Sequence, residues 1–267
     1  MQIDSLKQKT LEKVLKTKKY KHIHPPTVER IIDDLIRRFD HKRLEKEVKK
    51  KLHQVWGAYF TRPNFEKLEE KIQREYEEGK PPEQILSELL MLQTSTKERL
   101  SIFDSFYQEI FNIIETANTV LEYGCGVNAL SYHWMPEDIK YIGYDVDSEL
   151  IKFINLVYKL LGQDGKATVK LGDVFLFDNY HQADVCLLLK VLVLFDRQQK
   201  DSSLNIMRAI PVRYLVVSFP TRTLAGIDKG MEGNYRNMFM KLVGNEDWDI
   251  FEIVFDNELV FIIDKQS

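Results

Sequence analysis

Cysteine is scarce in this sequence, which has only Cys125 and Cys186 among its 267 residues. Neither has a CxxC partner, and the histidines lack the spacing of metal ligands, so we expect two reduced thiols and no metal site. No apolar run reaches the roughly 18 residues that a membrane span needs. The polar, Lys-rich residues 1–21 also lack the apolar core of a secretory signal. These absences predict a cytoplasmic protein without a membrane partner.

Charge is unevenly distributed along the chain. Residues 1–55 carry 16 Lys or Arg and 8 Asp or Glu, a local net charge of +8, whereas the remainder holds 22 basic and 33 acidic residues, a net charge of −11. A basic arm on an acidic body indicates contact with a polyanion, because each neutralised phosphate releases counterions. A solvated helical face would carry the same charges, so both interpretations stay open at this point.

The first part of the chain shows helical periodicity. Pro25 and Pro26 mark a helix start. The apolar stripe that follows has the spacing of an amphipathic helix: Val28, Ile31, Ile32, Leu35, Ile36 and Phe39. Its other face carries Arg30, Arg37 and Arg38. Further helices are predicted over residues 42–60, 64–78 and 82–111.

From residue 119 onward, strands alternate with helices. The expected strands cover residues 119–123, 140–144, 167–171, 183–189 and 213–219, with helices over 148–161 and 202–210. This alternation implies a parallel sheet with right-handed crossovers. The last two strands, 248–255 and 258–263, are expected to form an antiparallel hairpin. The predicted fold class is α/β: a doubly wound, mostly parallel sheet that resembles class I (Rossmann-like) methyltransferases, preceded by an N-terminal α-helical domain.

A glycine-rich turn follows the first expected strand. Gly124 and Gly126 lie where a strand gives way to a helix, the crevice in which such sheets bind ligands. Asp145 ends the second strand, where a carboxylate accepts hydrogen bonds from ribose hydroxyls. Asp173 and Val174 end the third strand, where they would meet the amino group and the ring of adenine. The pattern therefore predicts a nucleoside cofactor.

The glycines alone leave the cofactor open, because Gly124, Gly126 and Ala129 also satisfy the dinucleotide fingerprint. Glu122 favours S-adenosylmethionine, since it suits a methionine amino group and would repel a pyrophosphate. A nicotinamide-dependent oxidoreductase and a non-catalytic RNA-binding protein remain as alternatives. With S-adenosylmethionine as the cofactor, we expect a basic helical RNA-binding domain over 1–80, connecting helices over 81–118 and a catalytic domain over 119–267.

Several longer motifs resemble the Arm/Rmt family of aminoglycoside-resistance 16S rRNA (guanine-N7)-methyltransferases. They are Lys51–Tyr59, Thr94–Arg99, Leu187–Lys190, Val217–Leu224, Lys229–Glu232 and Asn234-Tyr235. The resemblance spans nearly the whole chain. It implies methylation of N7 of guanine 1405 in the decoding site of the assembled 30S subunit and resistance to aminoglycosides such as gentamicin and kanamycin. It also implies 16S rRNA as partner; we expect a monomer that does not bind DNA.

The resemblance also implies roles for single residues. Arg99 would pair with the cofactor carboxylate, Gly124 and Gly126 would form the cradle, and Asp145 would hold the ribose. Asp173 and Val174 would frame the adenine, while Tyr59, Leu189 and Gln198 would close the pocket. The sequence departs mildly from the family at Glu122, where Asp is frequent, and at Ala129 and Val193, where Pro is frequent.

The chemistry that this resemblance implies needs positioning rather than a base, because guanine N7 carries a free lone pair. The deep major groove of an RNA helix hides N7, so we expect the base to be flipped out and stacked on Phe219 or Tyr235. A ribose hydroxyl target, with Lys190 as base, is the weaker alternative. The candidates for phosphate contacts are Arg37, Arg38, Lys49, Lys50 and Lys51.

Overall fold

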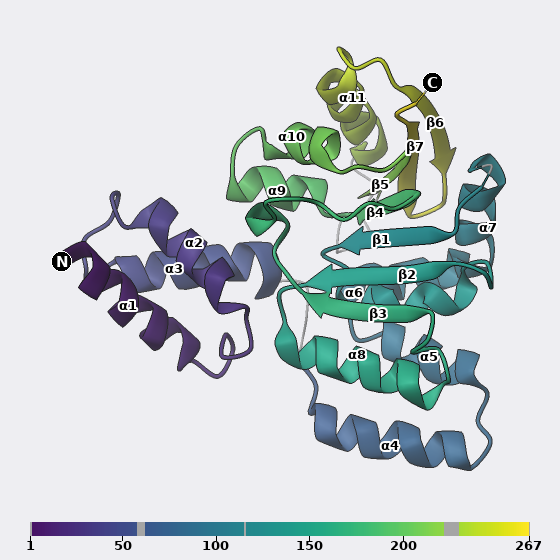
Figure 1. Cartoon of the computed structure of the whole chain (residues 1–267), viewed down its shortest axis with the longest axis horizontal. Helices are drawn as coiled ribbons and strands as arrows, with labels where there is room; N and C mark the ends of the chain where they lie inside the picture. Colours follow the sequence, from purple (N-terminus) through teal and green to yellow (C-terminus); the bar gives the residue numbers. More distant parts are fainter. Residues whose placement is uncertain (1, 58–61, 115, 222–229, 267) are drawn as a thin grey trace.

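The computed structural model describes residues 2–57, 62–114, 116–221 and 230–266. The N-terminal helices lie to one side of the sheet (Figure 1) and are α1 (Gln2–Leu15), α2 (Pro25–Leu35) and α3 (Leu44–Leu52), which runs on into a π-helical turn, η1 (His53–Gly57). Their apolar stripes meet in a small core of their own around Val14, Val28, Ile32 and Val48. We call this group of helices the N-terminal unit.

Four helices follow along one face of the sheet: α4 (Phe65–Glu77), α5 (Pro82–Leu90), α6 (Thr94–Arg99) and α7 (Phe103–Ile113). The prediction of one helix over 82–111 is wrong. Gln93 is extended, and the Thr96 hydroxyl donates to the carbonyls of Leu90 and Gln93. Side-chain bonds of this kind compete with the backbone hydrogen bonds of a continuous helix. A separate helix, α6, therefore begins at Thr94. A 3₁₀ turn, η2 (Leu100–Ile102), separates α6 from α7.

Within the described residues, seven strands form one sheet in the order β3-β2-β1-β4-β5-β7-β6. The strands are β1 (Thr119–Tyr123), β2 (Lys140–Asp145), β3 (Ala167–Leu171), β4 (Val185–Leu189), β5 (Tyr214–Pro220), β6 (Asp249–Val254) and β7 (Glu258–Asp264). β1 to β5 pair in parallel, and β7 runs antiparallel to both β5 and β6. The predicted fold class is confirmed.

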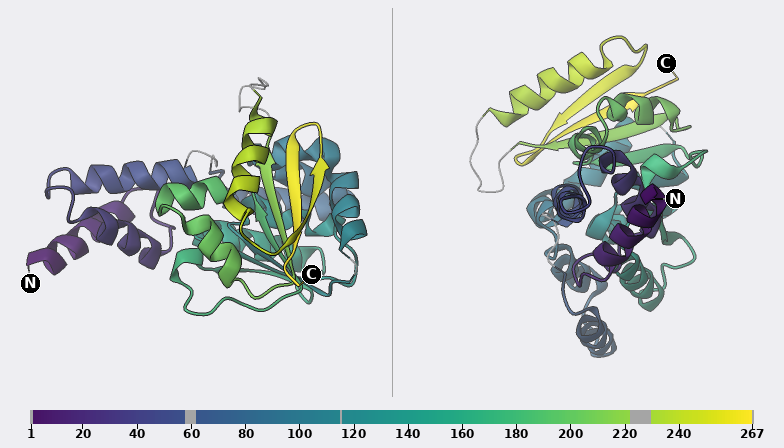
Figure 2. Two further views of the ribbon diagram at one scale, coloured as in Figure 1. Left: turned by 90° about the horizontal axis from the view of Figure 1, so that it is seen from above. Right: turned by 90° about the vertical axis from the view of Figure 1, so that its left-hand side faces the viewer.

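Helices cover both faces of the sheet (Figures 1 and 2). One face packs against α4, α5, α7 and α8 (Ser148–Leu160), and the other against α9 (Leu192–Gln198), α10 (Ser202–Ala209) and α11 (Met231–Val243). The segment after β1 is a 3₁₀ run, η3 (Gly126–Trp134), and a short 3₁₀ turn, η4 (Val174–Leu176), follows β3. None of the described helices is long and apolar enough to cross a membrane.

The predicted boundary at residue 80 lies after α4 and so assigns this helix to the N-terminal domain. In the structure, Phe65 and Ile72 of α4 pack in the core beside the sheet and not in the core of the N-terminal unit. The Phe65 ring packs against Phe153 of α8 at a centroid distance of 4.9 Å. The assignment of separate RNA-binding, connecting and catalytic segments stays a prediction.

Candidate functional site

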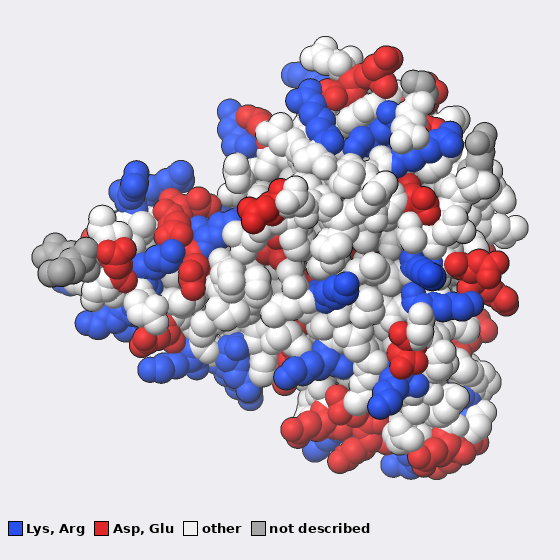
Figure 3. All heavy atoms as spheres, in the orientation of Figure 1, with Lys and Arg blue, Asp and Glu red and all other residues white. Residues whose placement is uncertain are grey.

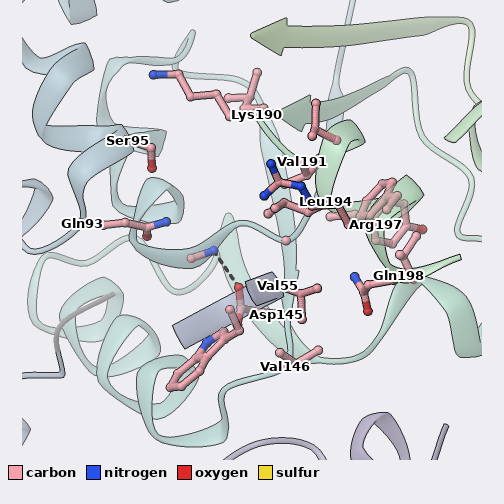
Figure 4. Close-up of a pocket in the computed structure, with 18 of the residues that line it drawn as sticks. Val55, Gln93, Ser95, Asp145, Val146, Lys190, Val191, Leu194, Arg197 and Gln198 are labelled. Atoms are coloured by element: carbon pink, nitrogen blue, oxygen red, sulfur yellow. Dashed lines mark hydrogen bonds between the residues drawn. The ribbon is translucent and has the colours of Figure 1, made fainter. Parts of the chain in front are cut away.

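A cavity of about 340 Å³ lies at the carboxyl ends of β1, β2, β4 and β5. The strand order reverses between β1 and β4, and ligands of doubly wound sheets bind at such a reversal. Figure 4 shows Asp145, Gln93, Lys190 and Gln198 around this space. The N-terminal unit supplies part of the wall: Ile23, Thr27, Leu52, Val55 and Trp56. The cavity is therefore formed by both parts of the molecule.

The glycine turn adopts a backbone that requires glycine. Gly124 has φ +70° and Gly126 φ +50°, and a Cβ on Gly126 would lie 2.5 Å from Oε1 of Gln93. The Gly126 N–H donates to Oδ2 of Asp145 at 2.9 Å, the bond drawn in Figure 4. Oδ1 of Asp145 accepts from the Asp147 N–H at 3.0 Å. The hydrogen bond between Gly126 and Asp145 thus fixes the glycine turn to the end of β2 at the cavity wall.

Asp145 is buried at this wall. Burial and the nearby Asp147 raise the pKa of Asp145 to about 6, against bonds from backbone N–H groups that lower it. A buried carboxylate at the end of β2 that lines a cavity fits the predicted contact with ribose hydroxyls.

Arg30 joins the residues expected around adenine. Asp173 and Val174 both line the cavity, and Oδ1 of Asp173 accepts from the Phe175 N–H at 3.0 Å. Oδ2 accepts from Nε and Nη2 of Arg30, at 3.1 and 2.8 Å. The same Nη2 donates to Oε1 of Gln198 at 2.7 Å. The sequence pattern placed Arg30 on the outer face of its helix, and no sequence signal marks this contact.

Arg99 and Glu122 lie behind the cavity wall, in a buried polar network. Arg99 donates to Glu258 through Nε at 3.0 Å and Nη2 at 2.5 Å, and to Asn128 through Nη1 at 2.5 Å. Glu122 accepts from Asn128 Nδ2 at 2.9 Å and from the Tyr141 hydroxyl at 2.6 Å. Neither belongs to the described residues that line the cavity. Their contacts with the methionine end of a cofactor stay predictions.

Lys190 lines the cavity from the end of β4, directly after Leu189. Its backbone has φ +59°, an unusual conformation for a residue with a side chain. The ammonium group lies 3.1 Å from Oε2 of Glu98 and 3.2 Å from Oε2 of Glu258. Two carboxylates therefore fix this cation at the wall.

Phe219 and Tyr235 both line the cavity and stack on each other, with ring centroids 5.0 Å apart and planes at 17°. Phe219 is also enclosed by Phe239 and Phe261, at 5.8 and 6.2 Å, and is only 1% exposed. Tyr235 is partly exposed. The geometry favours Tyr235 over Phe219 as a platform for a base. Tyr59, predicted to close the pocket, lies outside the described residues.

The predicted phosphate-contacting residues occupy different environments. Arg37, Arg38 and Lys50 are exposed. Lys49 pairs with Glu45 at 2.6 Å, and Lys51 donates to the Arg197 carbonyl beside the cavity. Figure 3 shows basic side chains over the N-terminal unit, with acidic ones between them. Arg37, Arg38 and Lys50 are therefore the candidates whose side chains are open to a polyanion.

The sheet order, the strand-end cavity and the glycine turn with its two carboxylates define a class I methyltransferase, the class that uses S-adenosylmethionine as methyl donor. Residues 16–262 match the family of ribosomal RNA methyltransferases (FmrO), so the chain belongs to that family. This confirms the family indicated by the sequence motifs and the predicted enzyme class, an S-adenosylmethionine-dependent rRNA methyltransferase. The nicotinamide alternative is wrong.

Individual relatives cover almost the whole chain. It is 34% identical over 277 residues to a 16S rRNA (guanine(1405)-N(7))-methyltransferase of Proteus mirabilis, with 98% of each chain covered. A structure of the 16S rRNA methyltransferase RmtF in complex with S-adenosyl-L-homocysteine superposes with a TM-score of 0.84 at 26% identity, covering 97% of both chains. The 16S rRNA methylase RmtB gives a TM-score of 0.78 at 26% identity, covering 97% of this chain and 98% of that one.

Proposed function

We propose that this protein transfers the methyl group of S-adenosylmethionine to N7 of guanine 1405 in 16S rRNA, within the assembled 30S subunit, and so confers resistance to aminoglycosides. The observation that carries the proposal is the 34% identity, over 98% of the chain, to an enzyme named for this reaction. The likeness to RmtF and RmtB over 97% of the chain supports it. The cytoplasm, where ribosomes reside, is the proposed location.

The cavity fits the cofactor. The glycine turn allows close backbone approach, Asp145 would hold the ribose, and Asp173 with Val174 would frame the adenine. Leu189 and Gln198 line the cavity, which supports their proposed role in closing the pocket. We assign the methionine end to the side of the cavity where Gln93, Ser95 and Lys190 lie. When bound, the cofactor supplies an electrophilic methyl group.

The protein's own contribution to the chemistry is positioning. Guanine N7 has a free lone pair and needs no deprotonation, so no base is required. Lys190, the base of the ribose alternative, is already engaged in ion pairs with Glu98 and Glu258. We propose that the target base is flipped out and stacks on the open face of Tyr235, next to the cavity.

The N-terminal unit is the proposed contact with rRNA phosphates, through Arg37, Arg38 and Lys50. Lys49 and Lys51 were predicted to share this role, and Lys51 already holds the α9 end of the cavity. We further propose a monomer without a role in DNA binding.

Primer extension after borohydride and aniline cleavage tests the proposal, on 16S rRNA from 30S subunits incubated with the protein and S-adenosylmethionine. A strong stop at guanine 1405 is expected. Asp145→Asn should abolish the stop, whereas the matched change Asp164→Asn at an exposed position should leave it intact. No stop with the wild type, while it still binds S-adenosylhomocysteine, would reject this atom and this RNA as the target.

A further inference from the structure

Besides the bond from Lys51 to the Arg197 carbonyl, two contacts made by α2 and the loop before it attach the N-terminal unit to the edge of the cavity. The first is a backbone contact, in which the His24 N–H donates to the Val146 carbonyl at 2.8 Å and the Ser148 N–H donates to the His22 carbonyl at 2.9 Å. This joins the loop before α2 to the loop after Asp145. The second is the side chain of Arg30, from the second turn of α2, which reaches Asp173 and Gln198.

Arg30 is held on three sides. Its guanidinium donates two hydrogen bonds to Oδ2 of Asp173 and one to Oε1 of Gln198, and its central carbon lies 4.4 Å from the centroid of the Phe175 ring. The Arg30 side chain is 13% exposed and that of Asp173 is 4% exposed. A buried charged group is costly unless it is paired and hydrogen-bonded, and Arg30 provides both the pairing and the hydrogen bonds for Asp173.

The contact also fixes which atom of Gln198 faces Arg30. A guanidinium has donors and no acceptor, so the side-chain oxygen of Gln198 must point towards it. The amide nitrogen of Gln198 is left as the donor for other partners. Arg30 therefore sets a carboxylate acceptor at Asp173 and an amide donor at Gln198 in one wall of the cavity. The 6-amino group and ring nitrogens of adenine complement this pair, whereas a 6-oxo purine would meet Asp173 with an acceptor.

We propose that Arg30 is a positioning residue of the cofactor site, supplied by the N-terminal unit, which orients Asp173 and Gln198 to select adenine. This inference rests on the proposed use of S-adenosylmethionine. It places a determinant of cofactor recognition in the helical unit expected to touch RNA, on the same helix as Thr27 of the cavity wall.

Calorimetric titration with S-adenosylhomocysteine tests the proposal on the purified full chain, without RNA. Arg30→Met should weaken binding about tenfold or more, because a charge-assisted network is removed. Arg30→Lys keeps the charge but cannot fork between two acceptors, so its affinity should fall between those of the wild type and Arg30→Met. The control is Arg74→Met, at an exposed position of α4, which should bind as the wild type does.

Two further comparisons separate positioning from general damage to the fold. In an Asp173→Asn background, Arg30→Met should have a smaller effect than in the wild type, because Arg30 acts in part through that carboxylate. The preference for S-adenosylhomocysteine over its inosine analogue should also shrink in Arg30→Lys. If Arg30→Met does not fold, the proposal is tested by whether Arg30→Lys shows a smaller preference for S-adenosylhomocysteine over the inosine analogue than the wild type does.

The inference is overturned if the Arg30 variants bind with wild-type affinity, or if the reductions in affinity from Arg30→Met and Asp173→Asn multiply independently. Failure of the wild type itself to bind S-adenosylhomocysteine would instead reject the proposed cofactor. The two failures are thus distinguishable.

Discussion

At the scale of single residues, burial controls the charge of Glu122. This side chain sits on β1 within the polar network behind the cavity, and desolvation raises its pKa to about 7 despite the Tyr141 bond and the Arg99 charge. The unfolded chain releases this proton near the ordinary value of 4.5, before the folded chain does. Between these two values the unfolded state binds fewer protons, so this group lowers stability as pH rises towards 7.

Glu122→Gln should therefore gain stability relative to the wild type as pH increases from 5 to 8. The shift in pKa sets an upper size of roughly 3 kcal/mol for the gain. Urea unfolding at several pH values measures the difference. Glu137→Gln, at an exposed position, is the control. A difference between Glu122→Gln and wild type that does not change with pH would contradict the assignment.

Phe219 and Tyr235 should respond differently to truncation, although they stack on each other. Phe219→Ala empties a site enclosed by Phe239 and Phe261, which costs about 3–5 kcal/mol of unfolding free energy. Tyr235→Ala should leave S-adenosylhomocysteine affinity intact and lower methylation of 30S subunits about 5- to 100-fold, since it removes one base–aromatic stack. Calorimetry and initial rates check the pair. Full activity of the double variant would exclude stacking on either ring.

At the scale of elements, a buried ion pair ties α6 to the C-terminal hairpin. Arg99 of α6 and Glu258 at the start of β7 are 1% and 0% exposed at their side chains. Burial would raise the pKa of Glu258, but the charges of Arg99 and Lys190 outweigh it and lower that pKa. The pair therefore joins the end of β7 that lies near the cavity to helix α6.

Arg99→Met should cost about 3–5 kcal/mol of unfolding free energy, because it leaves Glu258 buried without its main partner. Arg236→Met breaks partly exposed pairs with Glu252 and Glu232 and should cost less than about 1 kcal/mol. Urea unfolding compares the two. The double change Arg99→Met with Glu258→Met should cost less than the sum of the single changes. Equal costs for Arg99→Met and Arg236→Met would show that burial adds nothing at this pair.

Helices with a strong apolar periodicity were predicted from the sequence, whereas short or interrupted helices were not. Pro25 and Pro26 predicted the N-terminus of α2 correctly, whereas the predicted apolar stripe continues to Phe39 and α2 ends at Leu35. The helices α9 and α11 were not predicted: their N-cap residues in the described part of the chain, Val191 and Gly230, make no side-chain capping bond, and α11 buries only Phe239 and Val243. Such helices are stabilised mainly by packing against the sheet. The intrinsic helix propensity of their residues does not predict this contribution.

At the scale of the whole molecule, the N-terminal unit projects from the sheet on the side of the cavity, and Figure 2 shows it apart from the C-terminal hairpin. Its excess positive charge is exposed at Arg37 and Arg38, whereas the body carries a negative balance. This arrangement would bring rRNA phosphates to the unit while the rest of the surface repels them.

Changing Arg37 and Arg38 together to Ala should weaken binding to 30S subunits and flatten its salt dependence. The slope of log affinity against log salt should fall by about 0.7–0.9 for each phosphate that the variant no longer neutralises. Filter binding at several salt concentrations measures this slope. Lys140→Ala with Lys166→Ala, near the opposite ends of the strands, is the control pair. An unchanged slope in the Arg37 and Arg38 variant would remove these residues from the interface.

The fold class, the cofactor turn and the family follow from the order of the amino acids alone. Glycines at 124 and 126 and carboxylates at 145 and 173 follow strand ends, and parallel strands bring such ends to one edge whatever the detail of packing. The packing of the layers brings Arg30 to Asp173 and Gln198 and sets Arg99 against Glu258. It also encloses Phe219 and leaves Tyr235 partly exposed. These contacts join residues 143 and 159 positions apart along the chain, as in the Arg30–Asp173 and Arg99–Glu258 pairs. Local patterns cannot specify them, because they depend on how separately formed layers come to rest against each other.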